Sequence, residues 1–249
     1  MAVVTGASRG IGKAVAIALA RAGADVVCTA RSTSAAPSKL PGTIDDTVRD
    51  IEAPGRRALA VPCDVSKEAE VEALAQATLD RFGRIDLLVN NAAVNTWAPF
   101  AEMPMKRWDL VLNVNLRGVV VCTKAFLPHM SERKAGRIVN VSSGAAVDLK
   151  ISAELGIIAY SVSKIAVETL TEGLALELAP NGIAVNCLRI EMSVATEGAR
   201  FLNPEVDYSD WETPEGAAEA LLWLATQEPS YTAPVVTIAE TREAQGAGD

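Results

Sequence analysis

The stretch Thr5-Gly6-Ala7-Ser8-Arg9-Gly10-Ile11-Gly12 follows a short β-branched run, Ala2–Thr5, and opens a segment of helical periodicity, Ile11–Ala22. Glycines in a strand-to-helix turn allow a tight bend and let the backbone approach a bound pyrophosphate, and the helix N-terminus behind them offers unpaired N–H groups. The spacing G-x-x-x-G-x-G differs from the G-x-G-x-x-G dinucleotide fingerprint but uses the same physics. We therefore expect a dinucleotide to be bound here, unless the glycines serve the turn alone, and the expected contacts are Gly6, Ser8, Arg9, Gly10, Ile11 and Gly12.

Short apolar runs alternate with longer helical segments along the rest of the chain. The runs with the character of buried strands are Ala2–Thr5, Ala24–Ala30, Arg57–Pro62, Ile85–Asn90, Arg137–Ser142, Ile183–Leu188 and Val235–Ile238. Helical periodicity marks Ile11–Ala22, Ser66–Phe82 with Ser66 as its N-cap, Lys106–Met130, Ile158–Ala179 and Pro214–Ala225. Repeated β-α-β units predict an α/β fold, a doubly wound (Rossmann-type) parallel sheet of seven strands with helices on both faces. No linker divides the chain, so residues 1–249 are expected to form a single domain.

Composition excludes several other classes of function. Acidic residues outnumber basic ones by 31 to 23, which argues against nucleic-acid or anionic-membrane partners because both require basic patches. The single histidine, His129, excludes a multi-histidine metal site, and we expect no metal. Four cysteines without a CxxC pair are expected to be small buried hydrophobes in a reducing compartment: Cys28, Cys63, Cys122 and Cys187. No signal-peptide pattern and no apolar run of about 18 residues is evident, so the sequence predicts a cytoplasmic protein.

The end of the second strand-like run bears on which dinucleotide is bound. An NAD site would place an acid there to accept the ribose hydroxyls, but the chain reads Ala30-Arg31-Ser32. Guanidinium groups match phosphate geometry, so Arg31, Ser32 and Arg9 favour the 2′-phosphate of NADP. NAD remains the alternative, in which both arginines are simply solvated.

Tyr160 and Lys164 are the clearest candidates for acid–base chemistry. Their i, i+4 spacing puts the phenol and the ammonium on one helix face, where an ammonium at roughly 4 Å would stabilise the phenolate by about 4 kcal/mol. Tyr160 would then act as a general acid/base at neutral pH. The alternative is an ordinary surface pair. Asn115 also needs a reason for its place in an apolar helix, because Asn is a poor helix-interior residue.

Two segments interrupt the alternation of strand-like and helical segments, and the C-terminal end of the chain does not show this alternation. Ser32–Gly42 carries two prolines and reads as an insertion after the second strand. Met192–Thr213 is acidic and holds Phe201, Tyr208 and Trp211, so we expect residues 190–213 to form a lid over the substrate, unless the aromatics only pack the edge of the domain. Residues 240–249 are expected to be frayed.

Taken together, these motifs resemble the short-chain dehydrogenase/reductase family in its one-domain form. The resemblance extends from Val3 to about Ile238 and rests on motifs in the family's order: Thr5–Gly12, Asp64-Val65, Asn90-Asn91-Ala92, Asn115, Ser143 and Tyr160-x-x-x-Lys164. It implies an oxidoreductase that interconverts a small-molecule carbonyl and an alcohol by hydride transfer. It also implies homodimers or homotetramers built from the helices Lys106–Met130 and Ile158–Ala179.

The resemblance further implies a role for each matching residue. Tyr160 exchanges a proton with the substrate oxygen, Lys164 holds the nicotinamide ribose and assists Tyr160, and Ser143 orients the substrate oxygen. Asn115 anchors a water-mediated proton path to Lys164. The cofactor contacts it adds are Asp64 and Val65 at the adenine, Asn91 in the strand-end motif and Thr196, with Asn90 as a buttress of the glycine turn. Asp64 equally suits a turn or capping role.

The chain also departs from the family's pattern. Ala93 replaces a glycine after Asn90-Asn91-Ala92, and Ile190-Glu191 replaces a Pro-Gly beside the nicotinamide. Ser143 and Tyr160 are 17 residues apart, farther than is common. These departures keep a second function open, a non-catalytic dinucleotide-binding or regulatory protein of the same fold.

Overall fold

Seven parallel strands form one sheet in the computed structural model, which describes residues 1–232 and 235–246. The strands are β1 (Ala2–Thr5), β2 (Val26–Ala30), β3 (Ala58–Pro62), β4 (Leu87–Asn90), β5 (Gly136–Ser143), β6 (Ile183–Ile190) and β7 (Val235–Thr237). Their order is β3-β2-β1-β4-β5-β6-β7, so the direction of winding reverses between β1 and β4. The predicted doubly wound parallel sheet is confirmed, and its reversal point is where such folds bind ligands.

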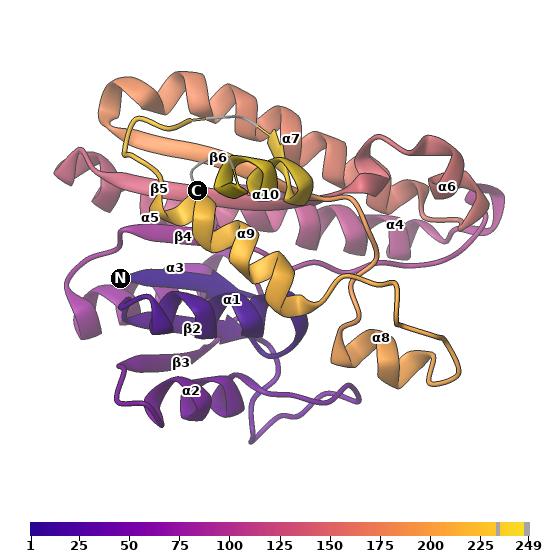
Figure 1. Ribbon diagram of the computed structural model, residues 1–249, viewed down its shortest axis with the longest axis horizontal. Helices are drawn as coiled ribbons and strands as arrows, with labels where there is room; N and C mark the ends of the chain where they lie inside the picture. The colour runs from indigo at the N-terminus through magenta and orange to yellow at the C-terminus, as the bar shows by residue number, and fades with distance from the viewer. Residues whose placement is uncertain (233–234, 247–249) are drawn as a thin grey trace.

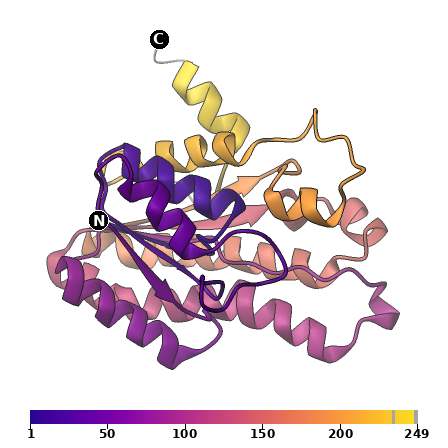
Figure 2. The same cartoon turned by 90° about the horizontal axis from the view of Figure 1, so that it is seen from below.

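Helices cover both faces of this sheet (Figures 1 and 2). One face is packed by α1 (Gly10–Arg21), α2 (Ile44–Glu52) and α9 (Pro214–Thr226), and the other by α3 (Glu68–Phe82), α5 (Gly118–Arg133) and α7 (Ile158–Leu178). Each layer has its own buried apolar cluster: Val15, Leu19, Ile51 and Leu221 on the first face, and Leu74, Phe126, Ala175 and Leu178 on the second. These two layers hold the sheet rigid and leave its carboxyl end to the connecting loops.

The carboxyl end of the sheet carries shorter helices, at the right of Figure 1. They are η1 (Phe100–Glu102), α4 (Met105–Leu112), η3 (Gly144–Ala146), α6 (Leu149–Glu154) and α8 (Glu197–Leu202). At the opposite end the single turn η4 (Ala179–Asn181) follows α7. The helix α10 (Ile238–Gly246) follows β7 and packs against α9. The loops at the carboxyl end therefore surround whatever is bound at the reversal point.

The helix predicted over Lys106–Met130 is divided. A π-helical segment, η2 (Asn113–Arg117), separates α4 from α5, and the buried Asn115 lies within it. The Asn115 side chain accepts from the Val94 N–H at 2.8 Å and donates to the Val94 carbonyl at 2.9 Å. The widened turn accompanies this pairing, in keeping with the occurrence of π-segments at functional sites.

Two local expectations are wrong, and one helix was not expected. Ser66 is not an N-cap, because its N–H and hydroxyl both donate to Asp64 and α3 begins only at Glu68. The helix α2 was not predicted, although Thr43 and Asp46 form a capping box at its start. The expected frayed end is helical through Gly246, because Glu191 accepts from the Ile238 N–H at 3.0 Å and fixes the start of α10. Residues 247–249 of that expected end lie outside the described residues.

One continuous helical stretch, Met105–Arg133, is long and apolar enough to cross a bilayer by length and composition, contrary to the expectation that no such run exists. Half of its apolar window is buried within the fold, however, where α5 packs on the sheet and on α3. Packing against the core therefore accounts for its apolar character.

All four cysteines are buried and free, as predicted. Burial raises the pKa of the Cys28 and Cys187 thiols to about 12, so they are protonated and unreactive at neutral pH. Among residues 1–232 and 235–246, no group of His, Cys, Asp and Glu is arranged to hold a metal ion.

Candidate active site

The turn between β1 and α1 requires its glycines for two reasons. Gly6 and Gly10 have φ values of 69° and 55°, in the left-handed region that side chains disfavour. At Gly12 a Cβ atom would lie 2.3 Å from the Gly6 carbonyl oxygen, so only glycine lets α1 start this close to the turn. The result is a bare backbone turn that directs the N-terminus of α1 toward the carboxyl end of the sheet, which favours an anion.

Asn91 holds this turn against β4. Its side-chain amide donates to the Thr5 carbonyl at 2.8 Å, while the Thr5 hydroxyl accepts from the Asn91 and Ala92 N–H groups at 3.0 Å. Asn90, which the resemblance gave this role, instead donates to Asn140 at 2.9 Å inside the sheet. The expectation for Asn90 is therefore corrected: side chains alternate along a strand, and Asn91 is the one directed at the turn.

A cavity of about 430 Å³ lies over the turn, at the reversal point of the sheet. Most of the predicted cofactor contacts line it: Gly6, Ser8, Arg9, Gly10, Ile11, Gly12, Arg31, Ser32, Asp64, Val65, Asn91 and Thr196. Tyr160 and Lys164 are not part of this lining. Sequence reasoning missed several of its mostly apolar walls: Ala30, Leu40, Cys63, Ala92, Ala93, Val94, Trp97, Val114, Gly198 and Ala199. Many of these wall residues have one recognisable feature in the sequence, namely that they are small, apolar and directly follow a strand.

The end of the cavity beside β2 and β3 is positively charged. Arg9 is partly buried and donates to loop 32–42, including bonds of 2.7 Å to the Pro41 carbonyl and 3.1 Å to the Ser32 hydroxyl. Burial lowers the pKa of Arg9, and the charge of Glu197 opposes that effect. Burial disfavours the Asp64 carboxylate, but hydrogen bonds from Ser66 and the charge of Arg31 outweigh it and lower the pKa of Asp64. This end of the cavity therefore carries an ionised Asp64 as well as Arg9 and Arg31.

Tyr160 and Lys164 lie side by side in the first turns of α7. The Lys164 ammonium is 5.4 Å from the centroid of the Tyr160 ring, and it donates to the Val141 carbonyl of β5 at 2.7 Å. Lys164 is 3% exposed, whereas Tyr160 is half-buried. The structure therefore brings together a buried cation and a phenol that solvent or a ligand can reach.

Asn115 connects the β4 loop to α7. Besides its pair with Val94, it donates to the Ser163 hydroxyl at 3.0 Å, and Ser163 immediately precedes Lys164. Ser143 ends β5, where its hydroxyl accepts from the Ala145 N–H at 3.3 Å. The four residues predicted to be catalytic thus belong to connected elements at one end of the sheet, namely η2, β5 and α7.

A buried ion pair beside Lys164 was missed by sequence reasoning. Glu168 is one turn farther along α7, accepts from the Ser142 hydroxyl at 2.7 Å and binds both Nε and Nη2 of Arg189 on β6 at 2.9 and 2.6 Å. The hydrogen bonds from Arg189 to Glu168 raise the pKa of the arginine. The i, i+8 spacing of Glu168 from Tyr160 was visible in the sequence, but its partner on β6 was not.

Residues 190–213, which were predicted to form a lid, border the cavity through Thr196, Gly198 and Ala199. Tyr208 is buried and donates from its hydroxyl to the Ala199 and Asn203 carbonyls, while Trp211 packs against its ring at 4.7 Å. Phe201 is exposed. The three aromatic residues therefore differ in role. Tyr208 and Trp211 stabilise the segment by packing together, whereas the Phe201 side chain is exposed. A further residue that was not predicted, Glu197, accepts from the Gly10 N–H at 2.7 Å.

Comparison with known proteins agrees with this geometry. A family model described as short chain dehydrogenase matches residues 1–206. The chain is 39% identical over 232 residues to a 3-oxoacyl-[acyl-carrier-protein] reductase of Synechocystis, covering 91% of this chain and 89% of the relative.

Solved structures show the same fold. A short chain dehydrogenase from Mycobacterium thermoresistibile superposes with a TM-score of 0.88 at 31% identity, covering 100% of this chain and 88% of that one. A metagenomic short-chain oxidoreductase in complex with NADP gives a TM-score of 0.77 at 32% identity, with 95% of each chain covered.

Proposed function

The chain belongs to the short-chain dehydrogenase/reductase family of oxidoreductases, and on this basis we propose that it interconverts a carbonyl and an alcohol with NADP(H). The observation that carries the proposal is the pair of Tyr160 and Lys164, with the ammonium 5.4 Å from the phenol ring. Asn115 and Ser143, the other two residues of the set, stand on the neighbouring elements. This arrangement supplies a proton donor, a charge that stabilises the donor's conjugate base, and a hydroxyl to orient the substrate.

The glycine turn suits a dinucleotide. A Cβ atom at Gly12 would collide with the Gly6 carbonyl and the Asn91 amide, so the glycine preserves the shape of the turn, and the N-terminus of α1 stabilises a pyrophosphate charge. Gly6, Ser8, Gly10, Ile11 and Gly12 would hold the pyrophosphate, Asp64 and Val65 the adenine, and Asn91, Thr196 and Lys164 the nicotinamide half. When bound, the cofactor supplies or accepts the hydride.

The chain's own residues manage the proton. In the reducing direction the Tyr160 hydroxyl gives its proton to the carbonyl oxygen as the carbonyl carbon gains the hydride, and in oxidation Tyr160 takes the proton back. Lys164 stabilises the phenolate, and Ser143 donates a hydrogen bond that keeps the substrate oxygen within reach of Tyr160. Asn115 would anchor the water that returns a proton by way of Lys164.

We assign NADP rather than NAD as the cofactor. The end of β2 offers Arg31 and Ser32 where an NAD site would offer a carboxylate, and Arg9 adds a second positive charge. The related oxidoreductase whose structure contains NADP is consistent with this choice. Asp64 is ionised close to Arg31, but it follows β3 rather than β2.

Exposed apolar side chains concentrate around the substrate end. Three loops follow β4, β5 and β6, at residues 91–104, 144–157 and 192–213. They carry most of the large exposed apolar residues, namely Trp97, Phe100, Val147, Leu149, Ile151, Leu155, Met192, Phe201, Leu202 and Val206. We expect these side chains to bury an apolar substrate, with residues 190–213 closing over it as a lid.

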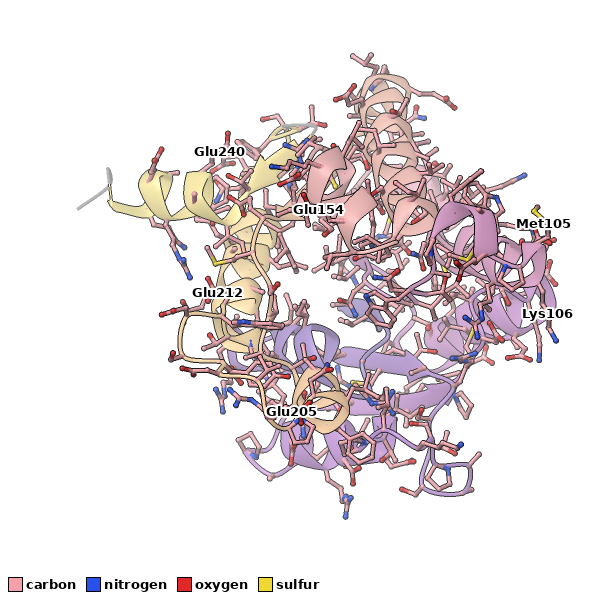
Figure 3. The ribbon with its side chains drawn as sticks, turned by 90° about the vertical axis from the view of Figure 1, so that its right-hand side faces the viewer. Met105, Lys106, Glu154, Glu205, Glu212 and Glu240 are labelled. Carbon is pink, nitrogen blue, oxygen red and sulfur yellow. The ribbon has the colours of Figure 1, made fainter. Side chains whose placement is uncertain are left out.

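Charge at the same end disfavours strongly anionic substrates. The three loops hold eight acidic and two basic residues. Figure 3 shows Glu154 on α6, and Glu205 and Glu212 on the lid, around this end of the molecule. An acyl-carrier protein or a coenzyme A thioester would bring negative charge to this acidic rim, which costs like-charge repulsion. The proposed substrate is therefore an uncharged apolar ketone, aldehyde or secondary alcohol.

Steady-state oxidation of NADPH against a carbonyl panel tests this function, with the panel graded by size, polarity and charge. The Tyr160→Phe variant should bind NADPH as the wild type does and lose about 10²- to 10⁴-fold in turnover, because only the proton donor is removed. Tyr231→Phe, at a half-buried tyrosine packed on Trp223, is the matched control and should remain active. Unchanged turnover in Tyr160→Phe would refute the mechanism.

The alternative, a non-catalytic dinucleotide-binding protein, is motivated by the departures at Ala93 and Ile190-Glu191. The Glu191 carboxylate accepts from the Ile238 N–H at 3.0 Å, so it serves the start of α10. Ala93 lies in the cavity wall and is exposed. Neither departure removes a residue of the proposed catalytic set. Tight NADPH binding with no turnover of any compound in the panel would instead favour this alternative.

We also propose a homodimer or homotetramer in the cytoplasm. The outward stripe of α7 contains Val162, Ile165, Gly173 and Leu176, and these residues are exposed. At Gly173 a Cβ atom would meet no other atom within 4 Å, so a second helix can approach closely there. Four buried, free cysteines suit a reducing compartment.

A further inference from the structure

The first turn of α1 already has an anion bound to it. The Gly10 N–H is one of the helix's N-terminal amides, which have no acceptor within the helix itself. Its acceptor is the Oε2 atom of Glu197 at 2.7 Å, a residue 187 positions away at the start of α8. Thr196 packs on the same spot, since a Cβ at Gly10 would lie 3.0 Å from its Cγ2 atom. The lid therefore touches the turn through both a carboxylate and a methyl group.

A dinucleotide needs the same place. A pyrophosphate at the glycine turn is stabilised by the N–H groups and the dipole of α1, and these are the features that the Glu197 carboxylate uses. Arg9 adds to the competition, because the charge of Glu197 affects the ionisation of Arg9 and the same arginine borders the cavity. One N–H cannot serve a carboxylate and a phosphate oxygen at full strength, and two anions at this distance repel each other.

We infer that Glu197 sets the affinity for the cofactor, because its carboxylate occupies part of the pyrophosphate position and must leave before the dinucleotide binds fully. The inference rests on the proposed dinucleotide function. Thr196, Gly198 and Ala199 line the cavity, so releasing Glu197 also frees the α8 wall. Cofactor binding is thereby coupled to a movement of the lid.

The test compares NADPH affinity in wild type, Glu197→Gln and Glu197→Ala by titration calorimetry. Gln keeps the shape and the acceptor but removes the charge, whereas Ala removes the competitor altogether. Both variants should bind NADPH about two- to fivefold more tightly, the range expected for losing one exposed charge at a helix N-terminus. Glu205→Gln is the matched control, because Glu205 is an exposed acid of the same lid that makes no hydrogen bond within the described part of the chain.

Two further readouts separate this mechanism from a general change in charge. The fragment 2′-AMP carries no 5′-phosphate and does not reach Gly10, so its affinity should be equal in all four proteins. Without ligand, Glu197→Gln should melt at the wild-type temperature or slightly below it, because a favourable contact is lost. With saturating NADPH, the melting temperature of Glu197→Gln should rise more than that of the wild type.

The outcomes distinguish the two proposals. If neither wild type nor variant binds NADPH or NADH, the dinucleotide function is wrong. If wild type binds NADPH and both Glu197 variants bind it equally or more weakly, the function stands and the role of Glu197 is overturned. Equal tightening in Glu205→Gln, or tightening of 2′-AMP, also overturns it, because the effect would then not come from the Gly10 N–H.

Discussion

At the scale of single residues, Arg9 and Arg31 have different roles at the end of the cavity beside β2 and β3, where the adenosine half of the proposed cofactor would lie. Arg9 makes five hydrogen bonds to loop 32–42 and so fixes that loop against the glycine turn. Arg31 is exposed and makes no hydrogen bond within residues 1–232 and 235–246. The guanidinium that is available to a 2′-phosphate is therefore that of Arg31, with Arg9 supplying charge from a fixed position.

Replacing Arg31 should change the choice of cofactor. In Arg31→Ala we expect the Kd of NADPH to rise about tenfold, because a charge-assisted hydrogen bond of this kind contributes about 1.5 kcal/mol. The Kd of NADH should stay within about twofold, since NADH has no 2′-phosphate. Arg21→Ala, at the exposed C-terminal end of α1, is the control for loss of a positive charge. An unchanged ratio of the two Kd values would remove Arg31 from the site.

The sequence was informative about residues whose role depends on their own neighbours and silent about those that depend on distant partners. Gly6, Gly10 and Gly12 share one turn, and Tyr160 and Lys164 share one helix face, so spacing alone brought them together. Glu197 meets Gly10 across 187 positions, and Glu168 meets Arg189 across 21. The sequence does not distinguish a Glu197 side chain that faces water from one that binds the N-terminus of a helix.

At the scale of elements, two side chains stabilise the end of β6 where the family has Pro-Gly. Arg189 binds Glu168 of α7, and the neighbouring Glu191 accepts from the first N–H of α10. The helix α10 in turn reaches the lid, since Arg242 pairs with Glu212 at 2.7 Å. The strand end, the lid and the C-terminal helix are therefore connected through charged side chains.

Removing the carboxylate charge at residue 191 should loosen α10. In Glu191→Gln we expect faster hydrogen exchange at the amides of residues 238–246 and a loss of about 1 kcal/mol in that helix, because its N-terminus loses an anionic cap. Glu243→Gln, at an exposed position of the same helix, is the control. Exchange that is identical in the two variants would show that Glu191 is not the anchor of α10.

Elements with strong periodicity were predicted well, and those stabilised from outside were not. The run Ala2–Thr5 matches β1 to the residue, because its hydrophobic pattern and the following glycine fix both ends. The helix α2 has only nine residues and directly follows the segment 32–42 that we interpreted as an insertion, and η2 depends on a side-chain pair with Val94 in another loop. The capping box of α2 is a local signal that the sequence does contain, whereas η2 depends on a tertiary contact that spacing does not reveal.

At the scale of the whole molecule, charge is distributed unevenly. The chain has a formal net charge of −8, yet the adenosine end of its cavity is lined by Arg9 and Arg31. The three loops at the substrate end instead hold eight acidic residues against two basic ones, and Figure 3 shows Glu154, Glu205 and Glu212 there. One end of the molecule is thus suited to an anionic cofactor, and the other to a substrate without negative charge.

The outward stripe of α7 should decide the state of assembly. Leu176 is 81% exposed in the single chain, so Leu176→Asp is compatible with the fold but would place an unpaired charge in a helix–helix interface. We expect sedimentation velocity to show a dimer or tetramer for the wild type. The variant should associate more weakly, with a dissociation constant at least about 30-fold higher. Phe201→Asp, which charges an equally apolar exposed position on α8, should leave the assembly intact. A wild-type chain that sediments as a monomer at every concentration would show that α7 faces solvent.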